Sequence, residues 1–290
     1  MSAAKGLSWF FFNTAFAKSL TFFSQLVLGW LLVPEEFGLY AIAVSIGVFI
    51  GMLRNGGVEQ VLIQRGKTFQ EFLPSAFIYS LLFNLLAMLV FILASSFVSD
   101  IYDDERLFYM LLIMSIVLPL GTPAVLYRAK LSIGRHYKEL ALQKTSAASI
   151  RQIMIVGFAL SGFGVYSFVI PMVIEVVVEA LVGWHFTKWV PKPGVLHLSI
   201  AKDLFKSCKW LMLASVMLGL ATTGDFFLLG LIITKEQLGV YFFGLQLVVS
   251  IATIYSTAIQ GVMLPALVPN VNDSTKFASM FSDALSKIFF

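Results

Sequence analysis

Polar side chains interrupt the long apolar stretches of this sequence at intervals that suit a binding site. In the stretch 7–33, four polar residues follow one another at intervals of three or four: Thr14, Lys18, Thr21 and Gln25. This spacing places all four on one face of a helix whose other faces carry Phe, Leu and Val. A lysine amine beside hydroxyl and amide groups can donate charge-assisted hydrogen bonds to an anion. We expect this stripe to face a hydrated cavity, in preference to a lysine merely paired inside a helix bundle.

Two arginines could extend this cationic surface. Arg54 precedes Asn55-Gly56-Gly57, where two glycines permit a bend, and Glu59 follows closely. Arg54 could therefore lie in a cavity floor or pair locally with Glu59, and the sequence leaves both possibilities open.

Arg151, in the segment 138–161, is the second arginine, and the next segment supplies acids that could meet it. Glu175 and Glu179 lie four residues apart within the segment 165–188. Antiparallel neighbours would place them at a similar depth, so we predict an Arg151–Glu175 or Arg151–Glu179 ion pair. A static pair is favoured over a transport role for these acids.

The composition indicates which elements must position these groups. Hydrophobic residues make up 59% of the 290 residues and charged residues only 12%, whereas soluble domains average about 25% charged residues. Backbone groups in lipid must be satisfied within the segment, which predicts helical spans. The alternating segments of about ten residues that a transmembrane barrel needs are absent. Cys208 is the single cysteine, so no internal disulfide forms, and we expect neither a metal site nor a cofactor.

We therefore expect an all-α integral membrane protein with eight spans and the start of a ninth. The start of the ninth falls in residues 275–290, and the eight spans have these approximate limits: 7–33, 36–64, 71–99, 105–127, 138–161, 165–188, 204–232 and 236–265. Connections after even-numbered spans are rich in Lys and Arg, whereas those after odd-numbered spans are acidic or uncharged apart from Arg106 and Lys235. Basic loops stay on the cytoplasmic side, which predicts a cytoplasmic N-terminus. The net charge of +4 reflects these loops and does not indicate a nucleic-acid partner.

A repeat organises the chain. The stretch LGWLLVPEEFGLYAIAVSI from Leu28 recurs as LGLIITKEQLGVYFFGLQL from Leu229, at an offset of 201 residues without a gap. With the loop charges, this predicts a two-lobed transporter of parallel six-helix repeats. We expect an N-terminal lobe at 1–190, a cytoplasmic linker at 191–203, and an incomplete second lobe at 204–290.

Positions that match across the repeat have expected roles as well. Gly38 with Gly239 and Tyr40 with Tyr241 are identical pairs, and we favour helix packing and interfacial anchoring over substrate contact for them. Asp225 corresponds to Ser24 in the first copy. If the lobes face each other, Asp225 should lie opposite the polar stripe, where it could balance charge or bind a coupling cation.

Residues 31–65, LLVPEEFGLYAIAVSIGVFIGMLRNGGVEQVLIQR, resemble the start of bacterial polysaccharide flippases of the multidrug/oligosaccharidyl-lipid/polysaccharide exporter superfamily. The resemblance rests on the PEEFGLYA turn, the Gly-Gly pair and the LIQR exit. It implies two six-helix lobes in the bacterial inner membrane that move an undecaprenyl-diphosphate-linked oligosaccharide repeat unit outward by alternating access. That activity serves lipopolysaccharide or exopolysaccharide biosynthesis, and the resemblance implies polysaccharide polymerase machinery as a partner. By position, the candidate diphosphate ligands are Lys18, Arg54 and Arg151.

Three other functions compete with this expectation. A drug/cation antiporter of the same superfamily would need a smaller cavity dominated by acids. A membrane enzyme that uses polyprenyl substrates would need a large extracytoplasmic loop, and the longest outer segment, around 99–106, is too short, so we expect no enzymatic activity. The sequence stops within an apolar run, and a non-transporting, truncated fragment is the third alternative.

Overall fold

The computed structural model describes residues 3–55, 57–66, 69–191 and 198–267, and no β-strand occurs within these ranges. The segment in which a ninth span is expected, 275–290, lies outside them, as do residues 192–197 of the expected linker. The described residues form ten α-helices: α1 (Ala3–Leu31), α2 (Pro34–Asn55), α3 (Val58–Arg65), α4 (Phe69–Tyr102), α5 (Glu105–Leu120), α6 (Thr122–Ile133), α7 (Tyr137–Leu160), α8 (Tyr166–Thr187), α9 (Leu198–Gly230) and α10 (Lys235–Leu267).

Each of the eight expected spans falls on one helix or on a broken pair. The segment 36–64 is divided into α2 and α3, and Gly57 caps α3 with a left-handed backbone (φ 73°) that glycine adopts without strain. The segment 105–127 is divided into α5 and α6, which are bent by 44° at Gly121 between Pro119 and Pro123. The expected linker 191–203 is partly helical, because α9 begins at Leu198.

Among the described residues, four helices are long and apolar enough to cross a membrane, or five if α5 and α6 form one span. Their limits by this criterion are Phe72–Tyr102, Tyr166–Thr187, Lys202–Gly230 and Lys235–Ser256. The apolar part of α1, Ala15–Leu31, is shorter. The described part of the chain is therefore all-helical, the protein is a multi-pass membrane protein, and its full number of spans stays a prediction.

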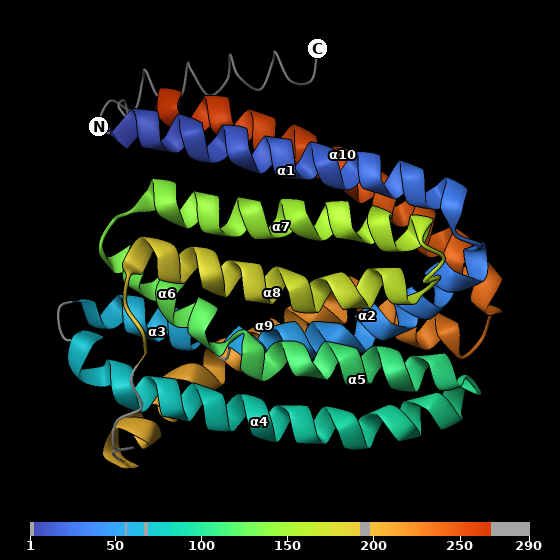
Figure 1. Cartoon of the computed structure of the whole chain (residues 1–290), viewed down its shortest axis with the longest axis horizontal. Coiled ribbons are helices and arrows are strands. Elements are labelled where there is room, and N and C mark those ends of the chain that lie inside the picture. The colour runs from blue at the N-terminus through green and yellow to red at the C-terminus, as the bar shows by residue number, and fades with distance from the viewer. Residues whose placement is uncertain (1–2, 56, 67–68, 192–197, 268–290) are drawn as a thin grey trace.

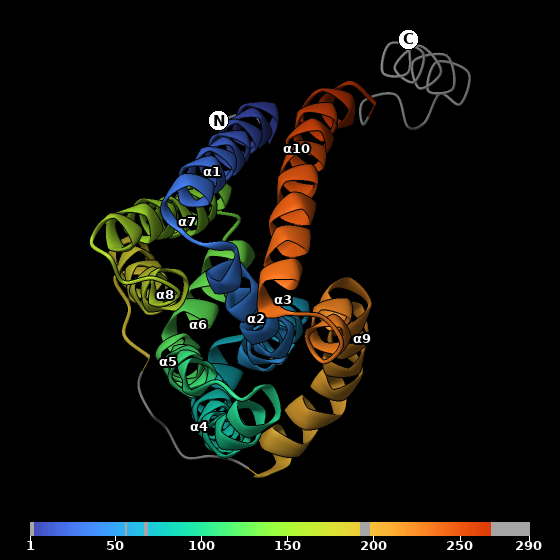
Figure 2. The same cartoon turned by 90° about the vertical axis from the view of Figure 1, so that its right-hand side faces the viewer.

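The helices run lengthwise as a bundle, with most connections at its two ends (Figure 1). We call the end with the α1–α2, α4–α5, α7–α8 and α9–α10 connections the Pro34 end, and the opposite end the Arg65 end. A large apolar cluster around Leu39 and Leu107 fills the Pro34 end. A smaller one around Leu62, Leu126 and Leu204 joins α3, α6 and α9 at the other. Figure 2 looks along the bundle and shows α10 beside α2, with α1 and α9 on different sides of it.

The two copies of the sequence repeat meet directly, and their contacts are reciprocal. A Cβ on Gly38 would overlap the carbonyl of Lys235, whereas a Cβ on Gly239 would overlap the carbonyl of Pro34, the repeat equivalent of Lys235. The α2 and α10 backbones therefore cross at this glycine pair, where neither position has room for a side chain. Packing is the role that we predict for Gly38 and Gly239, and the structure confirms it.

Further contacts repeat across the same crossing. In the first copy, a Cβ added to Gly29 would lie 2.6 Å from the ring of Phe243. In the second copy, a Cβ added to the equivalent Gly230 would lie 3.0 Å from the side chain of Ile42, the repeat equivalent of Phe243. The hydrogen bonds at the starts of α2 and α10 also correspond. The Val33 amide donates to the Glu36 side chain, and at the equivalent positions the Thr234 amide donates to the Gln237 side chain. A twofold axis between two copies produces this kind of reciprocity.

Candidate functional site

A cavity of about 190 Å³ lies between helices from both copies of the repeat. Its walls come from α1, α2, α7 and α8, together with α10 of the second copy. Aromatic rings form much of its surface, and four polar side chains besides Arg151 and Tyr40 line it: Thr21, Gln25, Gln152 and Gln246. An apolar cavity with a few convergent polar groups is the usual form of a small-molecule site.

Arg151 supplies the positive charge of this cavity. Its Nη2 donates a hydrogen bond of 3.2 Å to the Tyr40 hydroxyl, and its Nη1 lies 3.5 Å from Glu175 Oε2. The buried Nε has no hydrogen-bond partner among the described residues. A buried donor without a partner is costly, and an anion that accepted its hydrogen bond would remove this cost.

Tyr40 holds the arginine in place. Its ring stacks on Phe168 at a centroid distance of 4.1 Å and an interplanar angle of 10°, and Phe242 contacts it edge-on. Our prediction gave Tyr40 an anchoring role and did not connect it with Arg151. The sequence could not show that Tyr40 contacts Arg151, because the two residues are 111 positions apart. Its repeat partner Tyr241 is used differently and donates to Asp225.

The predicted polar stripe reaches the cavity in part. Thr21 and Gln25 line it, and Gln25 Oε1 accepts a hydrogen bond of 2.8 Å from Ser250 on α10. Thr21 also donates to the carbonyl of Ala17 within α1. Lys18 is exposed and does not line this cavity. The side chain of Thr14 lies outside the described residues.

The predicted ion pair of Arg151 forms with Glu175, and the alternative with Glu179 is wrong. Glu179 pairs instead with Arg128 of α6, whose Nε also donates 2.8 Å to Glu59. The four-residue spacing of the acids fixes their shared face, but α8 turns Glu179 towards α6. Glu59 is therefore paired with Arg128, while the side chain of Arg54 lies outside the described residues.

Asp225 does not lie opposite the stripe on α1. Its helix, α9, packs against α2 and α4, whereas α1 packs against α7 and α10. Asp225 Oδ2 accepts a hydrogen bond of 3.0 Å from Tyr241 in an exposed position, and it does not line the Arg151 cavity. The expectation is wrong because α2 and α10 pack against each other and separate α1, which contacts α10, from α9, which contacts α2.

Arg128, Glu59 and Glu179 form an ionic cluster that is almost fully buried. The Arg128 side chain is only 5% exposed. Because Arg128→Leu would leave two buried carboxylates without this arginine, we expect it to cost about 3–5 kcal/mol of stability. Thermal unfolding of the purified protein measures this loss. Lys144→Leu, at an exposed position on α7, is the control and should change little. Equal midpoints for the two variants would contradict the assigned role of Arg128.

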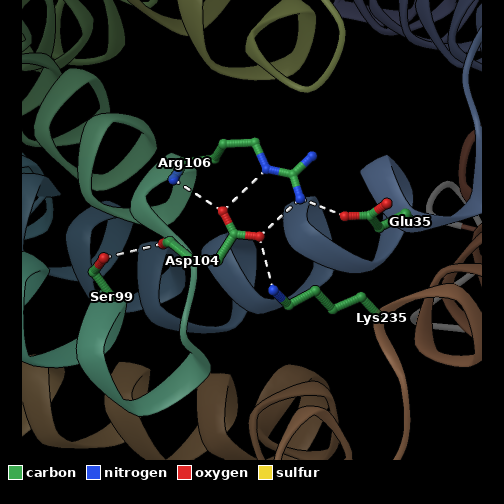
Figure 3. A network of polar contacts seen from close by, with 5 residues as sticks. All are labelled: Glu35, Ser99, Asp104, Arg106 and Lys235. Carbon is green, nitrogen blue, oxygen red and sulfur yellow. Dashed lines mark hydrogen bonds and ion pairs between the residues drawn. The ribbon is translucent and has the colours of Figure 1, made fainter.

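A second ionic network lies at the Pro34 end, and it joins Glu35, Asp104, Arg106 and Lys235 (Figure 3). Burial alone would raise the pKa of Asp104, but hydrogen bonds from Arg106 and Lys235 outweigh it and lower that pKa from 3.8 to about 2. A carboxyl group whose pKa is lower in the folded state stabilises the fold above its ordinary pKa. That stabilisation is lost as the pH falls through about 2.

The network should consequently persist under mildly acidic conditions. We expect Asp104→Asn to lower the unfolding midpoint at pH 7, because the charged partner of Arg106 and Lys235 is removed. The gap to the parent should narrow when both proteins are unfolded near pH 3, since the parent is then closer to the lowered pKa of Asp104, about 2. A gap that stays constant between these two conditions would contradict the lowered pKa.

These features define a class: a multi-pass helical membrane protein with a polar cavity between two copies of a repeat. Residues 27–290 match the model of a family described as polysaccharide biosynthesis protein, and the chain belongs to this family. It is also 22% identical over 191 residues to the succinoglycan biosynthesis transport protein ExoT of Rhizobium meliloti (strain 1021). That alignment covers 66% of this chain but only 39% of the relative, so the chain spans less than half of its length. No solved structure matches the chain.

Proposed function

We propose that the chain transports an undecaprenyl-diphosphate-linked oligosaccharide repeat unit across the bacterial inner membrane by alternating access. The transported unit would enter a cell-surface lipopolysaccharide or exopolysaccharide, and a polysaccharide polymerase would receive it. Two findings support this proposal: the chain belongs to a polysaccharide biosynthesis family, and it resembles a succinoglycan biosynthesis transport protein. We assign no catalytic step to the chain.

The observation that carries the proposal is the free Nε of Arg151 in a cavity between the two copies. A diphosphate that enters a cavity of low dielectric constant needs charge-assisted donors. An arginine can offer two parallel donors to a phosphate oxygen pair, which a lysine cannot. The glutamines and aromatic rings around Arg151 add the hydrogen-bond donors and flat apolar surfaces that suit a sugar attached to that diphosphate.

We further propose that Lys18 and Arg54 contribute to the same cationic path. Lys18 lies one turn before Thr21, which lines the cavity, and its exposed amine could meet the substrate on entry. Glu175 is the candidate coupling acid, because it is the acid paired with Arg151. Thr14, Thr21 and Gln25 would supply the remaining polar contacts along α1.

The proposed architecture has two lobes of parallel repeats, at 1–190 and from 204 onward, with residues 191–203 as the linker. It has eight spans and the start of a ninth. The Arg65 end would face the cytoplasm together with the N-terminus, because the basic connections lie there. The Pro34 end, with Glu35 and Asp104, would face the periplasm. The reciprocal contacts at Gly38 and Gly239 support an axis along the membrane normal.

Complementation tests this function. The full reading frame is expressed in a bacterial strain that lacks its polysaccharide flippase, and surface polysaccharide is measured. We expect polysaccharide to be restored in comparison with an empty vector. Failure to restore it, together with increased resistance to cationic drugs, would contradict the proposal and support an antiporter. Failure without such resistance, with the protein present in the membrane, would indicate a chain that does not transport by itself.

A further inference from the structure

The Pro34 end is fastened by an ionic network that joins the second copy of the repeat to the first six-helix segment. Asp104, which caps α5, is the centre of this network (Figure 3). Its Oδ1 accepts from the backbone and the Nε of Arg106 at 3.0 Å, and its Oδ2 lies 2.7 Å from Lys235 Nζ. Arg106 also pairs with Glu35 at the start of α2. Lys235 is thus the member of this network that comes from the second copy.

Lys235 stands out by its position. It is the first residue of α10, where the helix dipole disfavours a cation. It is also one of two basic residues in the connections after odd-numbered spans, and the other is its network neighbour Arg106. The contact is not repeated across the twofold axis, because the equivalent position in the first copy is Pro34. Asp104 therefore offsets a charge that α10 does not favour at its own start.

One further polar contact ties the second copy down at the same end. The Tyr102 hydroxyl, at the end of α4, donates 2.8 Å to the carbonyl of Phe227 on α9. Both contacts hold α9 and α10 against α4 and α5, one on each side of the connection between them. Phe242, Phe243 and Gln246 follow Lys235 along α10 and line the Arg151 cavity. A displacement of the α10 start away from Asp104 would therefore move a wall of that cavity.

We propose that the Lys235–Asp104 contact is a latch that keeps the Pro34 end closed over the Arg151 cavity. Its release lets the start of α10 swing away and opens the cavity towards that end. This inference rests on the proposed alternating access, but it concerns which contact must break. The close crossing at Gly38 and Gly239 acts as the pivot, because the backbones already touch there and cannot approach further.

Cysteine accessibility tests the latch without requiring transport. Cys208 is the single cysteine, so Gln246→Cys in a Cys208→Ala background gives one reporter in the cavity wall. A membrane-impermeant methanethiosulfonate reagent is added outside intact cells, and the rate of labelling is measured. Asp104→Asn and Lys235→Ala are then compared with the reporter alone. Asparagine remains a good helix N-cap, so Asp104→Asn removes the charge and keeps the start of α5.

The matched controls are neighbours that carry the same charges. Asp103→Asn and Glu236→Gln remove exposed charges beside Asp104 and Lys235, and no described contact links these two residues to the network. We expect labelling to rise about threefold to tenfold in the two latch variants and to stay unchanged in the controls. The double variant should match the single ones, because each breaks the same contact.

Two results would overturn the latch. If labelling in all four single variants equals that of the reporter alone, the contact does not control access. Labelling that rises equally in latch variants and controls would indicate a general charge effect. Complementation is measured separately, with the chain that retains Gln246, because Gln246→Cys changes a residue of the proposed binding cavity. If that chain restores polysaccharide but labelling does not rise in the latch variants, only the latch is contradicted. If labelling rises but that chain restores no polysaccharide, only the transport proposal is contradicted.

Discussion

Gly239→Ala is expected to destabilise the protein by about 1–3 kcal/mol, because the added methyl group has no space at the crossing of α2 and α10. The Cβ would overlap the backbone oxygen of Pro34, and the carbonyl carbon lies 2.7 Å away. Backbone atoms cannot rotate aside as a side chain can, so the two helices must separate. Gly38→Ala should behave in the same way, because its Cβ would meet the equivalent carbonyl of Lys235.

Gly244→Ala provides the matched control on the same helix. No described atom lies within 4 Å of its Cβ position, so only the helix propensity changes. Alanine is favoured over glycine within a helix by about 1 kcal/mol, and Gly244→Ala should therefore be neutral or stabilising. Thermal unfolding midpoints of the purified variants measure both effects. If Gly239→Ala and Gly244→Ala have the same midpoint, the close crossing of the repeat copies is not present.

Arg151→Gln is expected to lower the rate of polysaccharide transport about ten- to hundredfold, because a charge-assisted contact to the substrate is worth about 1.5–3 kcal/mol. Glutamine keeps a donor in the cavity but loses the charge and the fork of the guanidinium group. Arg151→Lys keeps the charge and should retain part of the activity. Surface polysaccharide in the complemented strain, corrected for the amount of membrane-inserted protein, is the measurement.

The ion pair with Glu175 requires a second variant, because Arg151→Gln also leaves that acid without its arginine. The double variant Arg151→Gln with Glu175→Gln removes both charges and should recover stability. Transport should stay lost if Arg151 binds the substrate, and it should return if the pair is only structural. Lys144→Gln on the same helix controls for the loss of a positive charge, and it should leave transport unchanged because Lys144 is exposed.

Much of the fold follows from patterns within single segments. The positions of the helices, the break near Gly57 and the face shared by Thr21 and Gln25 all depend on local spacing, and the structure contains each of them. The repeat also indicated close packing at Gly38 and Gly239, because small residues permit it. The local sequence could not show that these two glycines face each other, because that depends on how α2 and α10 cross.

The cavity was predictable only in part, for a similar reason. Spacing placed Glu175 and Glu179 on one face of α8, but the rotation of that helix decides which of them meets Arg151. Arg128 resembled a residue of a basic loop, and its burial against Glu59 and Glu179 depends on the bend between α5 and α6. Tyr40 is a partner of Arg151 through contacts between segments that are distant in the sequence, and local sequence patterns do not reveal such contacts.

The sidedness of the lipid-linked repeat unit tests the central claim most directly. The complemented strain also lacks the downstream polymerase, so that the lipid-linked oligosaccharide accumulates. Spheroplasts of this strain are treated with a glycosidase that cannot cross the membrane. The fraction of lipid-linked oligosaccharide that the enzyme cleaves reports how much has reached the outer leaflet. We expect the parent and Lys144→Gln to expose most of this pool, and Arg151→Gln to leave it protected. Equal cleavage with Arg151→Gln and the parent would contradict a substrate-binding role for the cavity.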